Sequence, residues 1–455
     1  MKKKACETDK KKTEQPLLSD EQLELLNSEI EKKDDRSQIE PFDTSVHAQA
    51  VRYAKKHKPS AIILIIAVIS VVAVIVTLLI YAISTAFAMP NKDDFRVIIG
   101  ENTFTADYDD IIIDDIAYID MNKLSLLDNI TISGDSISRK YTLPNLQYVR
   151  FNSDSDLAII DGNYISMGSK AIFKNNMCLV PYEFVEKITK SGIDFVFDKE
   201  NNKITITRIE IGKGDNDTPV YDPITFSIDN LNHTDVAYKE FNINFEEYSA
   251  FIDPKETTEY LILVNHENPL SSSYIPNDLV KLTCATNPVN SDPSYYKLRS
   301  IAEKALSAMM TAMKNSNIQG IQVSSSYRSY ARQEYLLQNY IESKMNIDGL
   351  SYDQAKKDVL KTLAMPGHSE HQTGLAVDFV QGTTSLTTDF ENTTAFAWLS
   401  QNAHKFGFIL RYPSDKVTTT GYDYEPWHYR FVGRTVASRI YEANICYEEY
   451  VALTK

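Results

Sequence analysis

Three histidines, two glutamates and an aspartate are concentrated in two short segments of the chain, PGHSEHQTGLAVDF over 366–379 and YEPWHYRFVG over 424–433. A catalytic zinc ion commonly takes three protein ligands from histidine and carboxylate side chains and leaves a fourth position for water. Glu425 is predicted to be the general base that takes a proton from that water and gives it to the leaving amine. The predicted zinc ligands are His371, Asp378 and His428.

The apolar residues around these positions alternate as they do in strands, and this predicts how the ligands are presented. Gly374 allows the chain to turn, and residues 375–379 then place Asp378 on the face opposite their larger apolar side chains. The alternation over 427–431 places His428 opposite three aromatic residues in the same way. Two such strands can present their polar faces to one cavity.

A third segment, SSYRS over 325–329, supplies a cation for the same reaction. Attack on a carbonyl develops an oxyanion, and we predict that the Arg328 guanidinium stabilises that oxygen or binds the terminal carboxylate of a substrate. The predicted hydrogen-bonding partners for a small peptide substrate are Ser326, Gln333 and Ser369.

Composition restricts the class of partner and the redox chemistry. The formal net charge of −15 over 455 residues makes nucleic acid an unsuitable partner, because phosphate binding needs a clustered basic surface. The four cysteines contain no CxxC pair, so they predict neither a thiolate zinc site nor a disulfide framework. At most one bridge, Cys284 with Cys446, is expected outside the cytoplasm, and free buried thiols are the more common state.

An almost uninterrupted apolar run over 61–88 predicts one transmembrane helix. Basic residues over 52–58 precede it, which predicts a cytoplasmic N-terminus and an extracytoplasmic chain after Met89. A cleaved signal peptide is the competing interpretation, but the run is long and follows a charged tail. That tail, residues 1–60, has too few apolar residues to fold and is predicted to be disordered.

The remaining chain predicts two folded domains of an α+β protein. Short period-two runs over 92–210 predict a smaller mixed domain of strands and short helices, and 211–245 is predicted to be a linker. Residues 246–455 are predicted to be the zinc peptidase domain, an antiparallel sheet with flanking helices.

Helix signals in the last domain are specific enough to place four helices. One is expected from Asp292 and Pro293 through Met313, and others begin after Ser329 and at Ser351, where Gln354 completes a capping box. The fourth helix includes 396–399 and is expected to end at Gly407. Strands are predicted over 408–410 and 427–431.

The motifs together resemble the zinc D-alanyl-D-alanine carboxypeptidases of the VanY type, which belong to the LAS-like metallopeptidases. The SxHxxGxAxD and ExxH patterns of that family and its SYRS element are all matched, and the resemblance covers about 246–450. It implies zinc as the cofactor and hydrolysis of the terminal D-Ala from peptidoglycan stem peptides or their precursors. The matching positions are Ser369, His371, Gly374, Ala376, Asp378, Glu425, His428 and the four residues 326–329.

A second, weaker resemblance concerns the segment LVPYEFVEKITKSGIDFVFDKENNKITITR. It is similar to the stalk-type domain related to the N-terminal domain of copper amine oxidases, which implies a spacer or wall-contacting module without copper.

Two groups of alternatives stay open. An L,D-carboxypeptidase or a wall endopeptidase of the same family shares every catalytic residue and differs only in the walls of the pocket. A non-catalytic cell-wall-binding module needs no base, so the presence of Glu425 argues against it.

Overall fold

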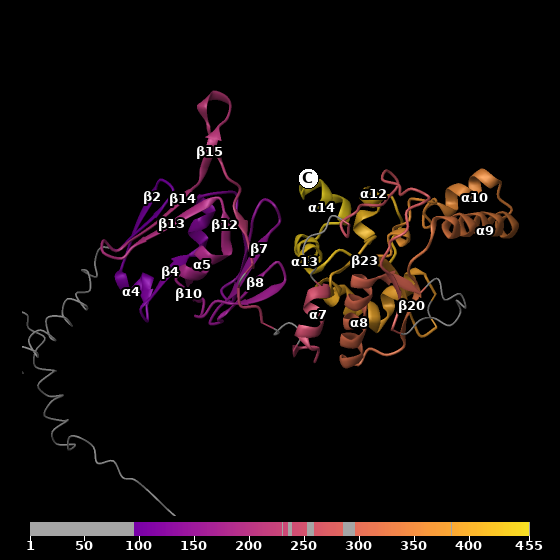
Figure 1. Cartoon of the computed structure of the whole chain (residues 1–455), viewed down its shortest axis with the longest axis horizontal. Helices are drawn as coiled ribbons and strands as arrows, with labels where there is room; N and C mark the ends of the chain where they lie inside the picture. Colours follow the sequence, from indigo (N-terminus) through magenta and orange to yellow (C-terminus); the bar gives the residue numbers. More distant parts are fainter. Residues whose placement is uncertain are drawn as a thin grey trace, which may run out of the picture. The chain divides into compact units, whose positions relative to one another are not determined.

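The computed structural model describes residues 95–454, apart from residues 230 and 384 and the segments 235–238, 253–258 and 285–295 (Figure 1). The predicted tail over 1–60 and the predicted membrane span over 61–88 lie outside the described residues. One point of the predicted fold class is corrected: within the described ranges, no helix is long and apolar enough to cross a membrane. The longest of these helices, Tyr330–Asp348, carries charged residues on several of its turns.

The N-terminal part of the described chain is built mainly of strands. Its elements are β1 (Phe95–Ile99), β2 (Asn102–Ala106), α4 (Tyr108–Ile111), β3 (Ile112–Ile113), β4 (Ile116–Asp120), η1 (Met121–Leu126), β5 (Thr131–Gly134), β6 (Ser138–Thr142), β7 (Tyr148–Asn152), β8 (Leu157–Ile160), β9 (Asn163–Ser166), β10 (Ile172–Lys174), β11 (Met177–Pro181), α5 (Tyr182–Ile188), β12 (Thr189–Ser191), β13 (Ile193–Asp198) and β14 (Lys203–Arg208).

These strands form a five-stranded meander, β5-β6-β7-β8-β9, and two four-stranded sheets, β13-β14-β1-β2 and β10-β11-β4-β3. The alternating apolar side chains of the sheets and of α5 bury one continuous core, which includes Phe95, Phe151 and Ile204. The segment predicted as a linker, 211–245, contains part of the hairpin of β15 (Glu210–Lys213) and β16 (Pro219–Tyr221) and strand β17 (Thr225–Phe226).

The C-terminal part mixes helices with one central sheet. Its elements are α7 (Phe245–Ile252), β18 (Leu279–Lys281), β19 (Lys297–Arg299), α8 (Ser300–Asn315), β20 (Ile321–Ser325), α9 (Tyr330–Asp348), α10 (Tyr352–Val359), η4 (Glu370–Thr373), β21 (Ala376–Gln381), η5 (Thr388–Asn392), α11 (Thr394–Asn402), η6 (Ala403–Phe406), β22 (Phe408–Leu410), η7 (Ser414–Lys416), α12 (Val417–Thr420), β23 (His428–Phe431), α13 (Arg434–Ala443) and α14 (Tyr447–Thr454).

The central sheet has the order β20-β21-β23-β22, and all of its neighbouring pairs are antiparallel, as predicted. The larger apolar residues of β21 and β23 and of the turns before them pack with the Met and Ala face of α8 into a second core. Helix α8 contacts β18 and β19, and α9 and α10 pack against each other at one side of this part (Figure 1). The opposite faces of β21 and β23 are therefore left to carry polar side chains.

Local signals fix the helix ends near the site. The Ser329 hydroxyl accepts a hydrogen bond from the Arg332 amide and begins α9, and Ser351 with Gln354 forms the predicted capping box of α10. Gly407 ends the turn after α11 with a positive φ of 82°, which a glycine adopts without strain. The helix predicted from 292–293 differs, because β19 pairs with β18 and α8 begins only at Ser300.

Candidate metal centre and active site

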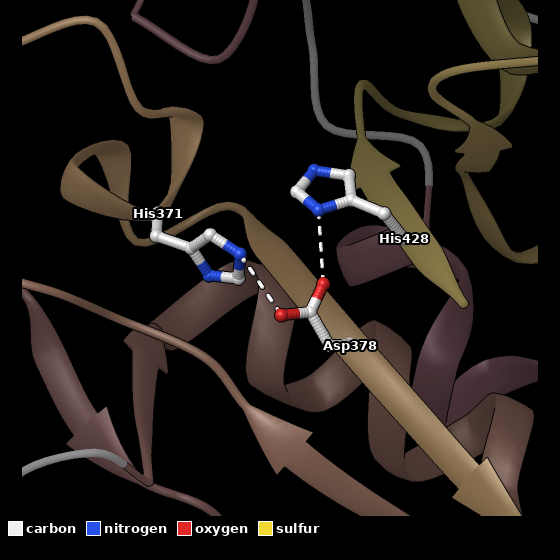
Figure 2. A group of neighbouring side chains, drawn as sticks. All are labelled: His371, Asp378 and His428. Carbon is white, nitrogen blue, oxygen red and sulfur yellow. Dashed lines mark ion pairs between the residues drawn. The ribbon is translucent and has the colours of Figure 1, made fainter. Parts of the chain in front are cut away.

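Asp378 occupies the centre of the candidate site because of strand register. In the antiparallel pair of β21 and β23 it lies directly opposite His428, and in the pair of β20 and β21 it lies opposite Ser325. His371 comes from the single turn η4, and Gly374, with a φ of 68°, closes that turn so that the chain can enter β21. Three segments therefore bring their side chains to one point (Figure 2).

The three predicted ligands face one another in a buried cluster. Asp378 lies between the two imidazoles: its Oδ2 is 3.2 Å from His371 Nε2 and its Oδ1 is 2.9 Å from His428 Nδ1 (Figure 2). One ligand atom from each residue lies within 4.8 Å of the other two, and all three residues are buried. Among the described residues, this is the one cluster of at least three such groups that could hold a metal ion.

The donor set fits zinc. Two donors bound at about 2.1 Å in a tetrahedral site are separated by about 3.4 Å. The two separations of 3.2 and 2.9 Å are close to that value. The His371 Nδ1 atom lies 2.6 Å from the Ser326 carbonyl oxygen, so it must carry the proton, and the Nε2 lone pair is free for a cation. Two neutral imidazoles and one carboxylate would leave a position for water.

Ionisation of the cluster is set by burial and by the mutual charges. Burial lowers the pKa of His371 below its usual range, which favours the neutral, metal-binding form. Burial alone would raise the pKa of Asp378, but His371 and His428 lower it by more, so the carboxylate stays ionised. Burial lowers the pKa of His428, and its contacts with Asp378 and Glu370 raise it by more, to about 9. A metal ion must displace that proton in order to bind.

Glu425 lies beside the cluster on the turn that precedes β23. Its Oε2 is 3.6 Å from His428 Nδ1, and the turn is fixed by a hydrogen bond from the His428 amide to the Glu425 carbonyl oxygen. Burial raises the pKa of the Glu425 carboxyl to about 8, which is a value suited to a group that accepts and returns a proton near neutral pH.

Arg328 is held in a fixed orientation next to the cluster. Its Nη1 donates to Gln333 Oε1 at 2.8 Å and its Nη2 donates to Ser325 Oγ at 3.0 Å. The same Nη2 is 3.9 Å from Asp378 Oδ2, and Arg328 lines the same cavity as the predicted ligands. Gln333 is itself fixed, because its Nε2 donates to the Ala364 carbonyl oxygen at 2.6 Å.

The cluster opens into a cavity of about 790 Å³, large enough for a short peptide. Its lining includes Ser369 and Arg328 but neither Ser326 nor Gln333. The Ser326 hydroxyl accepts a hydrogen bond from the Lys297 amide, and its carbonyl oxygen orients His371. The predicted peptide-binding residues thus differ in their positions: Ser369 faces the cavity, whereas Ser326 and Gln333 contact the residues that shape it.

Sequence reasoning missed Glu370, which lies one residue before His371, is buried and lines the same cavity. Its Oε1 accepts hydrogen bonds from Arg411 Nε and Arg430 Nη1, both at 2.8 Å. One signal was present in the sequence, since alternation along β23 places Arg430 on the same face as His428, where an arginine needs a buried acidic partner.

The cysteines take the state that was expected to be the more common. Cys178, Cys284 and Cys446 are all free, and Cys178 and Cys446 are buried. The Cys284–Cys446 bridge is therefore not formed.

An antiparallel sheet that presents two histidines and an aspartate beside a buried glutamate defines a metallopeptidase-type site. Comparison with known proteins gives the family: the model for VanY, D-alanyl-D-alanine carboxypeptidase, matches residues 295–434. One relative is YodJ of Bacillus subtilis (strain 168), which is named as a putative carboxypeptidase. It is 34% identical over 228 residues, which are 48% of this chain and 78% of YodJ. The chain belongs to the VanY family of D-alanyl-D-alanine carboxypeptidases.

Two further relatives are named for their activity. The D-alanyl-D-alanine carboxypeptidase of Enterococcus faecalis (strain ATCC 700802 / V583) is 35% identical over 198 residues, covering 43% of this chain and 66% of that protein. A crystal structure of the vancomycin-resistance D,D-pentapeptidase VanY in complex with Zn(II) is 33% identical, covers 42% of this chain and 99% of that one, and has a TM-score of 0.35.

Proposed function

We propose that this protein is a zinc carboxypeptidase that removes the C-terminal D-Ala from peptidoglycan stem peptides ending in D-Ala-D-Ala. The observation that carries the proposal is the convergence of three metal-ligating side chains and Glu425 in one buried cluster at the end of a peptide-sized cavity. Zinc would be held by His371 Nε2, His428 Nδ1 and a carboxylate oxygen of Asp378. The E. faecalis relative, which carries the name of this activity, supports the choice of substrate.

The chain's own residues account for substrate positioning and proton transfer. When bound, zinc would supply Lewis acidity to the attacking water and to the scissile carbonyl. Arg328, fixed by Gln333 and Ser325, would bind the terminal carboxylate or the oxyanion that develops on the carbonyl. The Ser369 hydroxyl lines the same cavity and can donate a hydrogen bond to the peptide.

Glu425 would move the proton. It takes one proton from the attacking water as the new C–O bond forms, and it gives that proton to the amine of the leaving D-alanine as the C–N bond breaks. The products are D-alanine and a stem peptide shortened by one residue. A pKa raised to about 8 by burial allows the carboxylate to hold the proton between the two steps.

Turnover by the Glu425→Ala variant tests this proposal. We expect zinc to be retained and kcat to fall by about a hundredfold or more, because the proton acceptor is lost while the three ligands remain. Glu334→Ala, which changes an exposed glutamate of α9, is the matched control and should keep the parent rate. Equal activity of Glu425→Ala and the parent would reject the mechanism.

The substrate is tested separately by mass spectrometry of products from pentapeptide, tetrapeptide and cross-linked muropeptides. Release of one D-alanine from the pentapeptide is the expected result. Release of D-alanine only from the L,D-linked tetrapeptide, or cleavage only of cross-links, would replace the D,D assignment by the L,D-carboxypeptidase or the endopeptidase assignment.

We further propose that the catalytic part acts outside the cytoplasm, where mature stem peptides are found, and that the strand-rich part over 92–210 serves as a spacer or wall contact. The hydrophobic core of that part contains no described residue of 246–455, which supports a role distinct from catalysis. Binding of the purified protein to isolated cell-wall sacculi, compared with a variant lacking that part, measures the contact.

A further inference from the structure

Glu370 is a buried carboxylate that the reaction does not use. Glu370 is one of the residues that line the cavity, and its Oε1 accepts hydrogen bonds from two arginines that are themselves fully buried, Arg411 and Arg430. Two guanidinium groups that donate to one carboxylate oxygen hold the group as the charged, acceptor-only form. Only one of its two oxygens is occupied by these contacts.

The second oxygen faces a metal ligand. Glu370 Oε2 lies 3.7 Å from His428 Nε2, the imidazole nitrogen that points away from Asp378. Within the described part of the chain, neither of these two buried atoms has a hydrogen-bond partner. A buried polar atom without a partner costs about 1–3 kcal/mol, so a small shift that closes this contact is favourable.

The chemistry of the pair decides which nitrogen of His428 carries the proton. An ionised carboxylate only accepts hydrogen bonds, so a contact with Glu370 requires the proton on Nε2. The lone pair is then left on Nδ1, the nitrogen that faces Asp378 at 2.9 Å. Histidine ligands of zinc commonly donate their second nitrogen to a carboxylate in this way.

We propose that Glu370 is a positioning residue that holds His428 as the Nε2–H tautomer and thereby presents Nδ1 to the metal ion. The inference rests on the proposed function, because it assumes that His371, Asp378 and His428 bind zinc. It goes beyond that function in assigning the buried carboxylate and its two arginines to the metal centre.

The two arginines that hold Glu370 are themselves fixed. Arg430 Nη2 donates to the carbonyl oxygens of Tyr260 and Ile262, at 3.0 and 2.8 Å. Arg411 binds the Glu448 carboxylate of α14 with both of its terminal nitrogens, at 2.8 and 2.6 Å. Two arginines and two glutamates balance in charge, so the set can stay buried, and a carboxylate held this firmly can orient the ring beside it.

Zinc affinity of the Glu370→Gln variant tests the inference. Glutamine keeps an oxygen that can accept from the two arginines. Its NH2 group, however, is a donor and cannot accept a hydrogen bond from His428 Nε2–H. We expect the dissociation constant for zinc, measured with a competing chromophoric chelator, to rise by about 10- to 100-fold. The visible spectrum of the cobalt-substituted protein should change as well, which loss of stability alone does not cause.

The matched control is Glu303→Gln. Glu303 is also a buried glutamate, and its Oε1 accepts hydrogen bonds from Thr283, but it belongs to α8 and contacts no predicted ligand. This variant should bind zinc with the affinity of the parent, and its thermal unfolding shows what the loss of a buried charge does by itself.

A second measurement needs no variant. In zinc-loaded parent protein with ¹⁵N-labelled histidine, NMR should show a protonated Nε2 and a metal-bound Nδ1 for His428. Coordination through Nε2 overturns the inference, and so does a folded Glu370→Gln protein with the zinc affinity and the cobalt spectrum of the parent. A parent protein that binds no zinc overturns the proposed function instead.

Discussion

The replacement Arg328→Lys tests how much of the rate depends on a fixed guanidinium rather than on a positive charge. In the native site Nη1 and Nη2 bind different acceptors, Gln333 Oε1 and Ser325 Oγ, so the plane of the group is set. A lysine ammonium has one nitrogen and a flexible chain, and it cannot hold both contacts while also facing the substrate. The charge is kept but its position is not.

The expected size of the effect follows from these contacts. Loss of one well-placed donor to a developing oxyanion costs about 2.7–4 kcal/mol, which corresponds to about 10²–10³ in rate. The lysine can bind only one of the two acceptors, Gln333 or Ser325. The acceptor that is left without a donor adds a cost of about 1–3 kcal/mol, which rearrangement of the lysine side chain can partly offset. We therefore expect kcat/KM to fall by about 100-fold and zinc affinity to stay within about threefold of the parent.

Release of D-alanine from a D-Ala-D-Ala peptide, followed by a coupled assay over a range of substrate concentrations, measures this loss. A fall in kcat at constant KM assigns Arg328 to the oxyanion, and a rise in KM at constant kcat assigns it to the terminal carboxylate. Arg139→Lys is the control, because Arg139 makes a similar pair of hydrogen bonds to Asn176 in the strand-rich part. A kcat/KM for Arg328→Lys within about threefold of the parent refutes the reasoning.

Two further predictions concern stability. Removal of zinc with a chelator should lower the melting temperature of the catalytic part by about 5–10 °C, since ligand at a hundred times its Kd adds about 2.7 kcal/mol; equal calorimetric traces with and without zinc would contradict the predicted site. Burial lowers the pKa of His404 to about 4, so its contribution to stability is fully present above the unfolded pKa of about 6.5 and is lost as the pH falls through about 4. The His404→Phe variant keeps a ring for the stack on Tyr441 but has no group that titrates there. Between pH values of about 6.5 and about 4, the unfolding free energy from urea titrations should therefore fall by up to about 3 kcal/mol more in the parent than in the variant. Equal falls in the two proteins would show that His404 does not titrate as described.

Local patterns predicted the elements that present the ligands. Alternation over 375–379 and 427–431 placed Val377, Phe379 and Tyr429 in the core and left Asp378 and His428 on the other face. Ser329 and Ser351 marked the starts of α9 and α10, because capping depends on residues only three positions apart. Signals of this kind depend on residues that lie within about five positions of one another in the sequence.

Features that depend on distant residues were not predictable in the same way. Leu298 fits the helical period of α8, but pairing of β19 with β18 takes it into a strand, since tertiary pairing overrides local preference. Glu370 meets Arg411 and Arg430 only because η4, the end of β22 and β23 converge. The sequence signals only that Arg430 needs a buried acidic partner, and it does not show that Glu370 is that partner.

The ion pair between Arg411 and Glu448 has a practical consequence for cutting this protein into fragments. The region matched by the family ends at residue 434, whereas the carboxylate that neutralises Arg411 lies beyond it on α14. A recombinant fragment trimmed to the matched region would lose this carboxylate, and it would also lose Tyr447, whose ring packs on Arg411, together with the apolar side chains of α13 and α14. Expression boundaries for crystallisation or inhibitor screening should therefore be drawn after Thr454 rather than at the edge of the family match.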